Sequence, residues 1–71
     1  MNAIRIAVTL NGAPQTVAPG TTLAALMAAT GQPPQAMSTA VNGDFVARAA
    51  RETCVLREGD AVFTFQPITG G

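Results

Sequence analysis

The sequence predicts an α+β fold in which one main helix packs across one face of a mixed sheet of four to five strands. Three observations support this: strand-like alternation near both ends of the chain, two Asn-Gly pairs that each separate short strand-like stretches, and one stretch with helical spacing. Strands and a helix in separate blocks are typical of α+β proteins. With 71 residues, the chain forms one domain at most.

The first element is a half-buried strand over residues 4–10, because apolar side chains alternate there with small or polar ones. Its apolar face consists of Ile4, Ile6, Val8 and Leu10. Asn11-Gly12 follows, and both residues tolerate the positive φ of a two-residue hairpin turn. Residues 13–17 then return as a second strand. Pro14 lacks an N–H, so this strand is expected at the edge of the sheet.

A helix is predicted to begin after "APG", with Thr21 or Thr22 as its N-cap. Its apolar stripe has the spacing i, i+3, i+4 and i+7, and consists of Leu23, Leu26, Met27 and Thr30. Gly31 stands where a left-handed C-cap belongs. Gln-Pro-Pro-Gln at 32–35 ends the helix and leads out through an extended loop.

The second half repeats the hairpin in shorter form. Residues 39–41 and 44–46 flank Asn42-Gly43, residues 47–52 are expected to form one helical turn, and residues 61–65 form the last strand. A helical crossover lets this strand run parallel beside the first, in the centre of the sheet. The order β-β-α-β-β with a protruding C-terminus is that of a β-grasp, or ubiquitin-like, fold. The predicted domain is 1–65, followed by an extended, flexible tail at 66–71 that ends in Gly-Gly.

Composition argues against several classes of function. The net charge is zero, the four arginines are scattered, and there is no Lys or His, so we expect neither nucleic-acid binding nor a histidine-based site. One cysteine cannot build a disulfide framework or a zinc site, and we expect no metal and no bound cofactor. No leader peptide or membrane-spanning stretch is recognisable, which predicts a cytoplasmic protein that does not enter membranes.

The side chains offer little chemistry of their own. Cys54 has apolar neighbours and is interpreted as a small buried hydrophobe. Glu58, Asp60 and Asp44 are explained by the turns in which they occur. The chain is therefore not expected to be an enzyme. What remains is the C-terminus, where two glycines without side chains can enter a narrow channel and present a free carboxylate. Adenylation would turn that carboxylate into an electrophile for a sulfur or amine nucleophile.

Three segments carry a resemblance to a known family. "NGAPQTVAPGTTLAALMAATG" at 11–31, "VNGDFVAR" at 41–48 and "REGDAVFTFQPITGG" at 57–71 resemble, in this order, the ThiS family of ubiquitin-like sulfur carriers in thiamine biosynthesis. The likeness covers nearly the whole chain. It departs from the family's pattern at Ala47, where a proline is common, and in the tail, where Pro67 and Thr69 replace small aliphatic residues.

The resemblance implies a role for each part of the tail. An adenylating enzyme of the ubiquitin-activating-like family would use ATP to activate Gly71, a sulfur-relay donor would convert the adenylate to a thiocarboxylate, and thiazole synthase would take the sulfur. Gly70, Thr69 and Ile68 would enter the active sites of these partners. The chain itself is expected to be a monomer when free.

The last strand leaves two orientations open. Buried aromatic residues are the norm, which would put Phe63 and Phe65 in the core. The family pattern instead turns Val62 inward under the helix and leaves Phe63 and Phe65 as a partner-binding patch beside the tail. Ile68 on the tail would add an apolar anchor.

Several functions other than a thiamine carrier also remain open. The small subunit of molybdopterin synthase has the same fold and the same thiocarboxylate chemistry, and sulfur carriers of amino-acid biosynthesis are a further possibility. A protein modifier joined through Gly71 to target lysines belongs to a different class. A pure interaction module, with idle terminal glycines, would keep its binding when Gly71 is removed.

Overall fold

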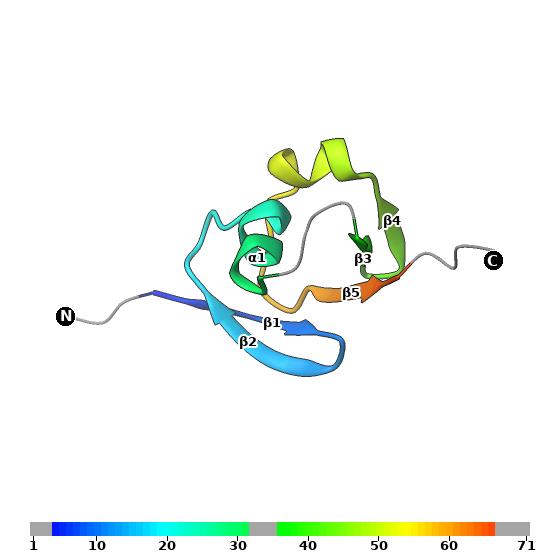
Figure 1. Cartoon of the computed structure of the whole chain (residues 1–71). Helices are drawn as coiled ribbons and strands as arrows, with labels where there is room; N and C mark the ends of the chain where they lie inside the picture. The colour runs from blue at the N-terminus through cyan, green and yellow to red at the C-terminus, as the bar shows by residue number, and fades with distance from the viewer. Residues whose placement is uncertain (1–3, 32–35, 67–71) are drawn as a thin grey trace, which may run out of the picture.

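The computed structural model describes residues 4–31 and 36–66, and it confirms the predicted α+β, ubiquitin-like arrangement. A mixed five-stranded sheet has the strand order β2-β1-β5-β3-β4, and the helix α1 lies across one of its faces (Figure 1). In chain order the elements are β1 (Ile6–Leu10), β2 (Ala13–Val17), α1 (Leu23–Ala29), β3 (Ser38–Val41), β4 (Asp44–Val46), the 3-10 helix η2 (Arg48–Thr53) and β5 (Ala61–Phe65).

The two Asn-Gly pairs form the turns that the sequence predicts. Asn11 and Gly12 have φ values of 53° and 85°, and Asn42 and Gly43 have 54° and 86°. Positive φ at both central residues is the requirement of a type I′ turn, whose twist matches that of the flanking strands. Each turn joins an antiparallel pair, β1 with β2 and β3 with β4. β2, which contains Pro14, is an edge strand as predicted.

The helix α1 begins and ends with the expected caps. Thr22 is the N-cap, and its Oγ1 accepts a hydrogen bond of 3.2 Å from the backbone N–H of Ala25. Gly31 has a φ of 78°, the left-handed conformation that glycine adopts without steric cost. One detail of the predicted stripe is wrong. Thr30 is exposed and serves as the C-cap, so it does not belong to the buried face.

The core lies between α1 and the sheet. Its buried members come from β1, α1, the segment before β5 and β5 itself, and they are Val8, Leu23, Leu26, Met27, Leu56 and Val62. Partly buried side chains of the other strands pack around them. The predicted first strand, residues 4–10, is wrong at Ile4. This residue precedes β1, and its side chain is 77% exposed, so it does not belong to the core.

β5 is the central strand, and both neighbouring hairpin turns hold it. It runs parallel to β1 and antiparallel to β3, as the crossover predicts. The side chain of Asn42 accepts a hydrogen bond of 2.9 Å from the backbone N–H of Ala61, at the start of β5. The side chain of Asn11 accepts one of 2.9 Å from the N–H of Thr64, near its end. In each case the side-chain amide of the turn asparagine forms a hydrogen bond to β5 just beyond the end of the strand that precedes the turn.

Arg51 is a buried cation that the sequence did not predict, since the four arginines appear scattered there. Its side chain is 4% exposed and reaches from η2 to β3. Nε donates to Thr39 Oγ1 at 3.0 Å, and Nη2 donates to the carbonyl oxygen of Met37 at 2.6 Å. The Thr39 hydroxyl in turn donates to the carbonyl oxygen of Val46 in β4 at 2.9 Å. Arg51 thus ties η2 to the outer half of the sheet.

Replacing Arg51 by alanine should destabilise the protein clearly, while the same change at Arg48 should not. Arg51→Ala removes the donor to the buried Thr39 hydroxyl and to the partly buried carbonyl oxygen of Met37, which costs about 1–3 kcal/mol. Arg48 lies on the same 3-10 helix but is exposed, so Arg48→Ala should change the free energy of unfolding by less than about 0.5 kcal/mol. Urea denaturation of both variants measures the difference. Equal stabilities would contradict the structural role given to Arg51.

Candidate functional site

The two faces of β5 differ sharply in burial. Val62 is fully buried beneath α1, whereas Phe63 is 44% exposed and Phe65 is 48% exposed. Successive side chains of a strand point to opposite faces, so both phenylalanines lie on the face away from α1. The orientation favoured by the family resemblance is the one that the structure has. That these residues bind a partner stays a prediction.

Phe45 adds a third aromatic side chain that the sequence analysis did not assign to the patch. Ala40 of β3 pairs with Phe45 of β4 on one side and with Phe63 of β5 on the other. Paired residues share a face of the sheet, so the three form one row across the strands. Phe45 is 68% exposed. The signal was present in the sequence: the two-residue turn at Asn42-Gly43 fixes the register that places Phe45 opposite Ala40.

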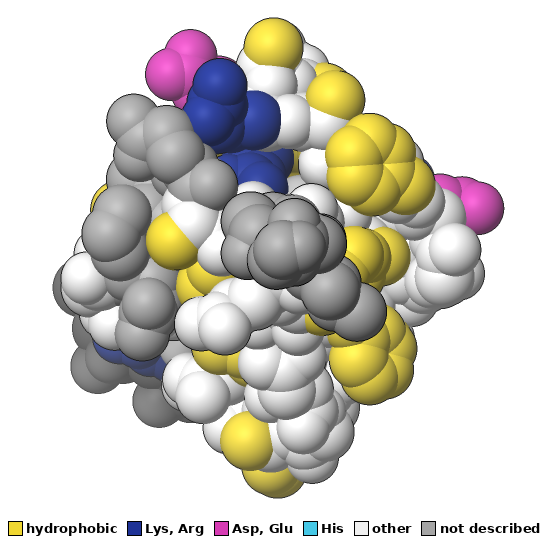
Figure 2. All heavy atoms as spheres, turned by 45° about the vertical axis from the view of Figure 1, so that its right-hand side comes forward, with side chains coloured by type: hydrophobic (Ala, Val, Ile, Leu, Met, Phe, Trp, Pro, Cys, Tyr) yellow, Lys and Arg dark blue, Asp and Glu magenta, His cyan; other side chains and the backbone are white. Residues whose placement is uncertain are grey.

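All three phenylalanines of the chain therefore lie on one exposed face of the sheet. We call this set the phenylalanine surface: Phe45, Phe63 and Phe65. Figure 2 shows large hydrophobic side chains along the right-hand side of the molecule, with an acidic group beside them. Exposed aromatic side chains that cluster in this way are typical of protein-binding surfaces, since aromatic anchors supply much of the binding energy.

The remaining predicted site residues belong to the C-terminal tail. Ile68, Thr69, Gly70 and Gly71 lie outside the described residues, so their roles stay predictions. β5 ends at Phe65, and the division into a domain of residues 1–65 and a tail of residues 66–71 stays a prediction. Gln66 is exposed and is the last residue described. The chain thus leaves the sheet from the same strand that carries two members of the phenylalanine surface.

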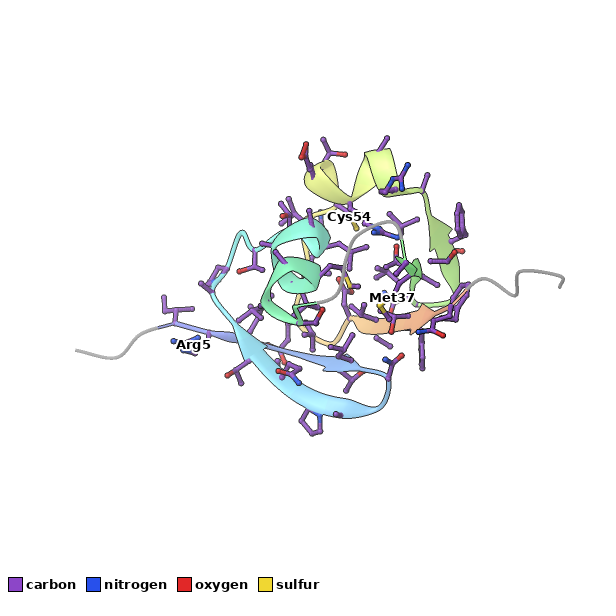
Figure 3. All side chains as sticks on the ribbon, viewed as in Figure 1. Arg5, Met37 and Cys54 are labelled. Atoms are coloured by element: carbon purple, nitrogen blue, oxygen red, sulfur yellow. The ribbon has the colours of Figure 1, made fainter. Side chains whose placement is uncertain are left out.

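Cys54 and the acidic residues have structural surroundings. Cys54 is partly rather than fully buried, and packs against the core between η2 and α1 (Figure 3). Glu58 Oε1 accepts a hydrogen bond of 2.9 Å from the N–H of Ala7, and Asp60 Oδ2 accepts one of 2.8 Å from the N–H of Arg57. Asp60 thus closes the turn before β5, as the sequence predicts, whereas Glu58 links that turn to β1. In residues 4–31 and 36–66, no three potential metal ligands of the His, Cys, Asp or Glu types lie together.

A hollow of about 360 Å³ lies between α1 and η2, on the helix-bearing side of the sheet. Its lining is dominated by small and aliphatic parts of side chains, and comprises Ala24, Met27, Ala28, Arg48, Ala49, Arg51 and Glu52. It is separated from the phenylalanine surface by the sheet itself. Within the described part of the chain, no helix has the length and hydrophobicity needed to cross a membrane.

The strand order, the parallel β1–β5 pair and the single helix across one face define a ubiquitin-like β-grasp domain. Its exposed aromatic face and its C-terminal Gly-Gly place the candidate site on and beyond β5.

Comparison with known families then identifies the chain more closely. The model of the ThiS family matches residues 8–71, and the chain belongs to this family. A solved structure of the thiamine biosynthesis protein ThiS from Geobacter metallireducens is similar to it, with a TM-score of 0.82 and 28% sequence identity. The similarity covers 93% of this chain and 100% of that one. No curated protein sequence matches the chain significantly.

Charge placed on the two faces of β5 should have opposite consequences for folding. Phe65→Asp puts a carboxylate on an exposed face, so the variant should remain folded, with a loss of about 1 kcal/mol or less. Val62→Asp buries a carboxylate beneath α1 and should unfold the domain. Circular dichroism and urea denaturation distinguish these results. An unfolded Phe65→Asp variant would indicate instead that Phe65 belongs to the core.

Proposed function

We propose that this chain is a sulfur carrier protein of thiamine (thiazole) biosynthesis. It acts as a co-substrate of enzymes rather than as an enzyme. The observation that carries the proposal is the extent of the family match, which runs through the last strand to Gly71 and so includes both terminal glycines. The name of the similar Geobacter metallireducens structure, a thiamine biosynthesis protein, supports the same pathway.

The proposed chemistry uses the carboxylate of Gly71. A carboxylate oxygen attacks ATP on an adenylating enzyme of the ubiquitin-activating-like family, and pyrophosphate leaves. The outer sulfur of a persulfide on the relay donor then attacks the acyl carbon and AMP leaves, which gives an acyl disulfide. A second thiol attacks the donor's sulfur, forms a disulfide with it and releases the terminus as a thiocarboxylate. Thiazole synthase accepts that sulfur. Dividing the substitution into two steps with a good leaving group makes each step easier. ATP is bound by the activating enzyme, and the carrier binds no cofactor of its own.

The proposed site has an anchor and an arm. The phenylalanine surface docks on each partner, and the arm after Phe65 carries the reacting carboxylate into the partner's active site. Six residues follow Phe65, enough for roughly 20 Å at about 3.4 Å per residue. Gly70 keeps the arm narrow beside the reacting group, and Ile68 and Thr69 contact the channel walls. The free protein acts as a cytoplasmic monomer that docks transiently.

Intact-protein mass spectrometry tests the proposal. After incubation with ATP, a ThiS-type activating enzyme and a sulfur donor, the chain should exchange one oxygen for one sulfur at Gly71. A chain lacking Gly71 keeps the whole described domain and should gain no sulfur. Feeding the sulfurated protein to thiazole synthase then tests the pathway.

Each outcome of that experiment is informative. Sulfuration without transfer to thiazole synthase would favour another sulfur carrier, such as the small subunit of molybdopterin synthase. A mass that stays unchanged while a control carrier is converted would overturn the sulfur-carrier proposal. Attachment of the chain to target lysines would indicate a protein modifier instead.

The docking role of the phenylalanine surface has its own test. Phe45→Asp should raise the KM for the carrier in adenylation by about tenfold, which corresponds to about 1.4 kcal/mol of lost binding, because a charge replaces an apolar anchor. Ile4→Asp provides a matched control, since Ile4 is an exposed hydrophobic residue outside this surface. Pyrophosphate exchange kinetics measure both variants. Equal KM values for the two variants would remove Phe45 from the docking surface.

A further inference from the structure

We propose that Asn11 is a positioning residue for the C-terminal arm: its side chain fixes the direction in which β5 leaves the sheet. This inference rests on the proposed function, because it concerns how the carboxylate of Gly71 reaches a partner's active site. Asn11 is far from the arm in sequence, but its side chain forms hydrogen bonds with Thr64 of β5, the strand that the arm follows.

The two neighbouring strands β1 and β5 end at different points along the sheet. β1 ends at Leu10, which pairs with Val62, and the chain then turns away at Asn11. β5 continues for three residues beyond this pair, through Phe65. The backbone N–H of Asn11 still donates to the carbonyl oxygen of Val62 at 2.8 Å. Past this point β1 offers β5 no further backbone partner, because the hairpin reverses.

The side chain of Asn11 supplies hydrogen bonds to β5 where β1 has already ended. Its Oδ1 accepts a hydrogen bond of 2.9 Å from the N–H of Thr64, and its Nδ2 donates one of 2.8 Å to Thr64 Oγ1. The amide thus makes two hydrogen bonds to one residue, which fixes both its backbone and its side chain. On the opposite side of β5, Phe65 pairs with Ser38 of β3. The end of β5 is therefore held from both sides only while Asn11 is present.

This position links the anchor to the arm. Phe63 and Phe65 belong to the proposed docking surface and flank Thr64, while Gln66 begins the arm. If the end of β5 were held by β3 alone, the arm could leave at a range of angles relative to the docked face. Group transfer depends strongly on the placement of reacting atoms, and a displacement of about 1 Å can lower the rate by about a hundredfold. Loss of Asn11 should thus affect turnover more than docking.

The chain contains a matched control in Asn42. It occupies the same turn position, with nearly the same φ, and its Oδ1 accepts from the N–H of Ala61 at 2.9 Å. Its hydrogen bonds hold the start of β5, at the end of the strand away from the arm. Glycine adopts positive φ freely, so Asn11→Gly and Asn42→Gly each keep the turn and remove only the amide.

Pyrophosphate exchange on a ThiS-type activating enzyme, with the full chain, tests the inference. Asn11→Gly should lower kcat about tenfold and leave KM within about twofold. Asn42→Gly should keep kcat within about twofold of the unsubstituted chain. Thr64→Val, which removes the hydroxyl but keeps the backbone hydrogen bond to Asn11, should give a smaller loss of kcat than Asn11→Gly. Urea denaturation of each variant establishes that the molecules assayed are folded.

A second measurement does not depend on any enzyme. Amide hydrogen exchange at Thr64 should be much faster in Asn11→Gly and unchanged in Asn42→Gly, because only the first change removes the acceptor of that amide. Equal kcat values for the two glycine variants, or an unchanged exchange rate at Thr64, would overturn the positioning role alone. If the unsubstituted chain supports no pyrophosphate exchange while a control carrier does, both the proposed function and this inference are wrong.

Discussion

The structure depends on how its central strand is held. β5 lies between a parallel and an antiparallel neighbour, buries Val62 beneath α1, and carries two of the three phenylalanines on the opposite face. Neither neighbour is long enough to pair with all of it, and the asparagines of the two hairpin turns supply the remaining hydrogen bonds. Asn11 and Asn42 thus have two roles: each adopts the positive φ of its turn, and its side chain forms a hydrogen bond to β5. The side-chain amide has the donor and acceptor of a peptide group, so it continues a ladder where the backbone has already turned away.

Because the apolar core is small, hydrogen bonds between elements are important for holding the fold together. A chain of this length buries only about 60% of the surface that its unfolded form exposes. The buried apolar residues form one small cluster under α1, and the outer strands β3 and β4 are joined to the rest partly by Arg51. Its guanidinium donates to Thr39 of β3 and to the carbonyl oxygen of Met37, just before that strand, and the Thr39 hydroxyl donates to Val46 of β4. These hydrogen bonds brace the half of the sheet that carries Phe45.

Most of the fold could be predicted from the sequence because its signals are local. An Asn-Gly pair between alternating strands specifies a turn and its register, and Thr22 and Gly31 mark the ends of α1. The errors concern burial, which depends on distant segments. Ile4 continues the alternation of β1 in the sequence, yet it precedes the strand and is exposed. Arg51 resembles a surface residue in sequence, and only the approach of η2 to β3 encloses it. Phe45 joined the site through cross-strand pairing, a step that requires the register of three strands.

Under the proposed function, the docking surface and the reacting tail belong to one strand and the segment that follows it. A carrier of this kind must bind each partner enzyme briefly and present the same terminal group each time. If the docking surface and the arm belonged to separate elements, every flexible connection between them would widen the range of positions that the carboxylate explores. Placing Phe63 and Phe65 immediately before the tail shortens that connection to a few residues, and Thr64 between them is held on both sides, by Thr39 and by the side chain of Asn11. The sheet thus continues to Phe65, six residues before Gly71, whose carboxylate reacts in the proposed function.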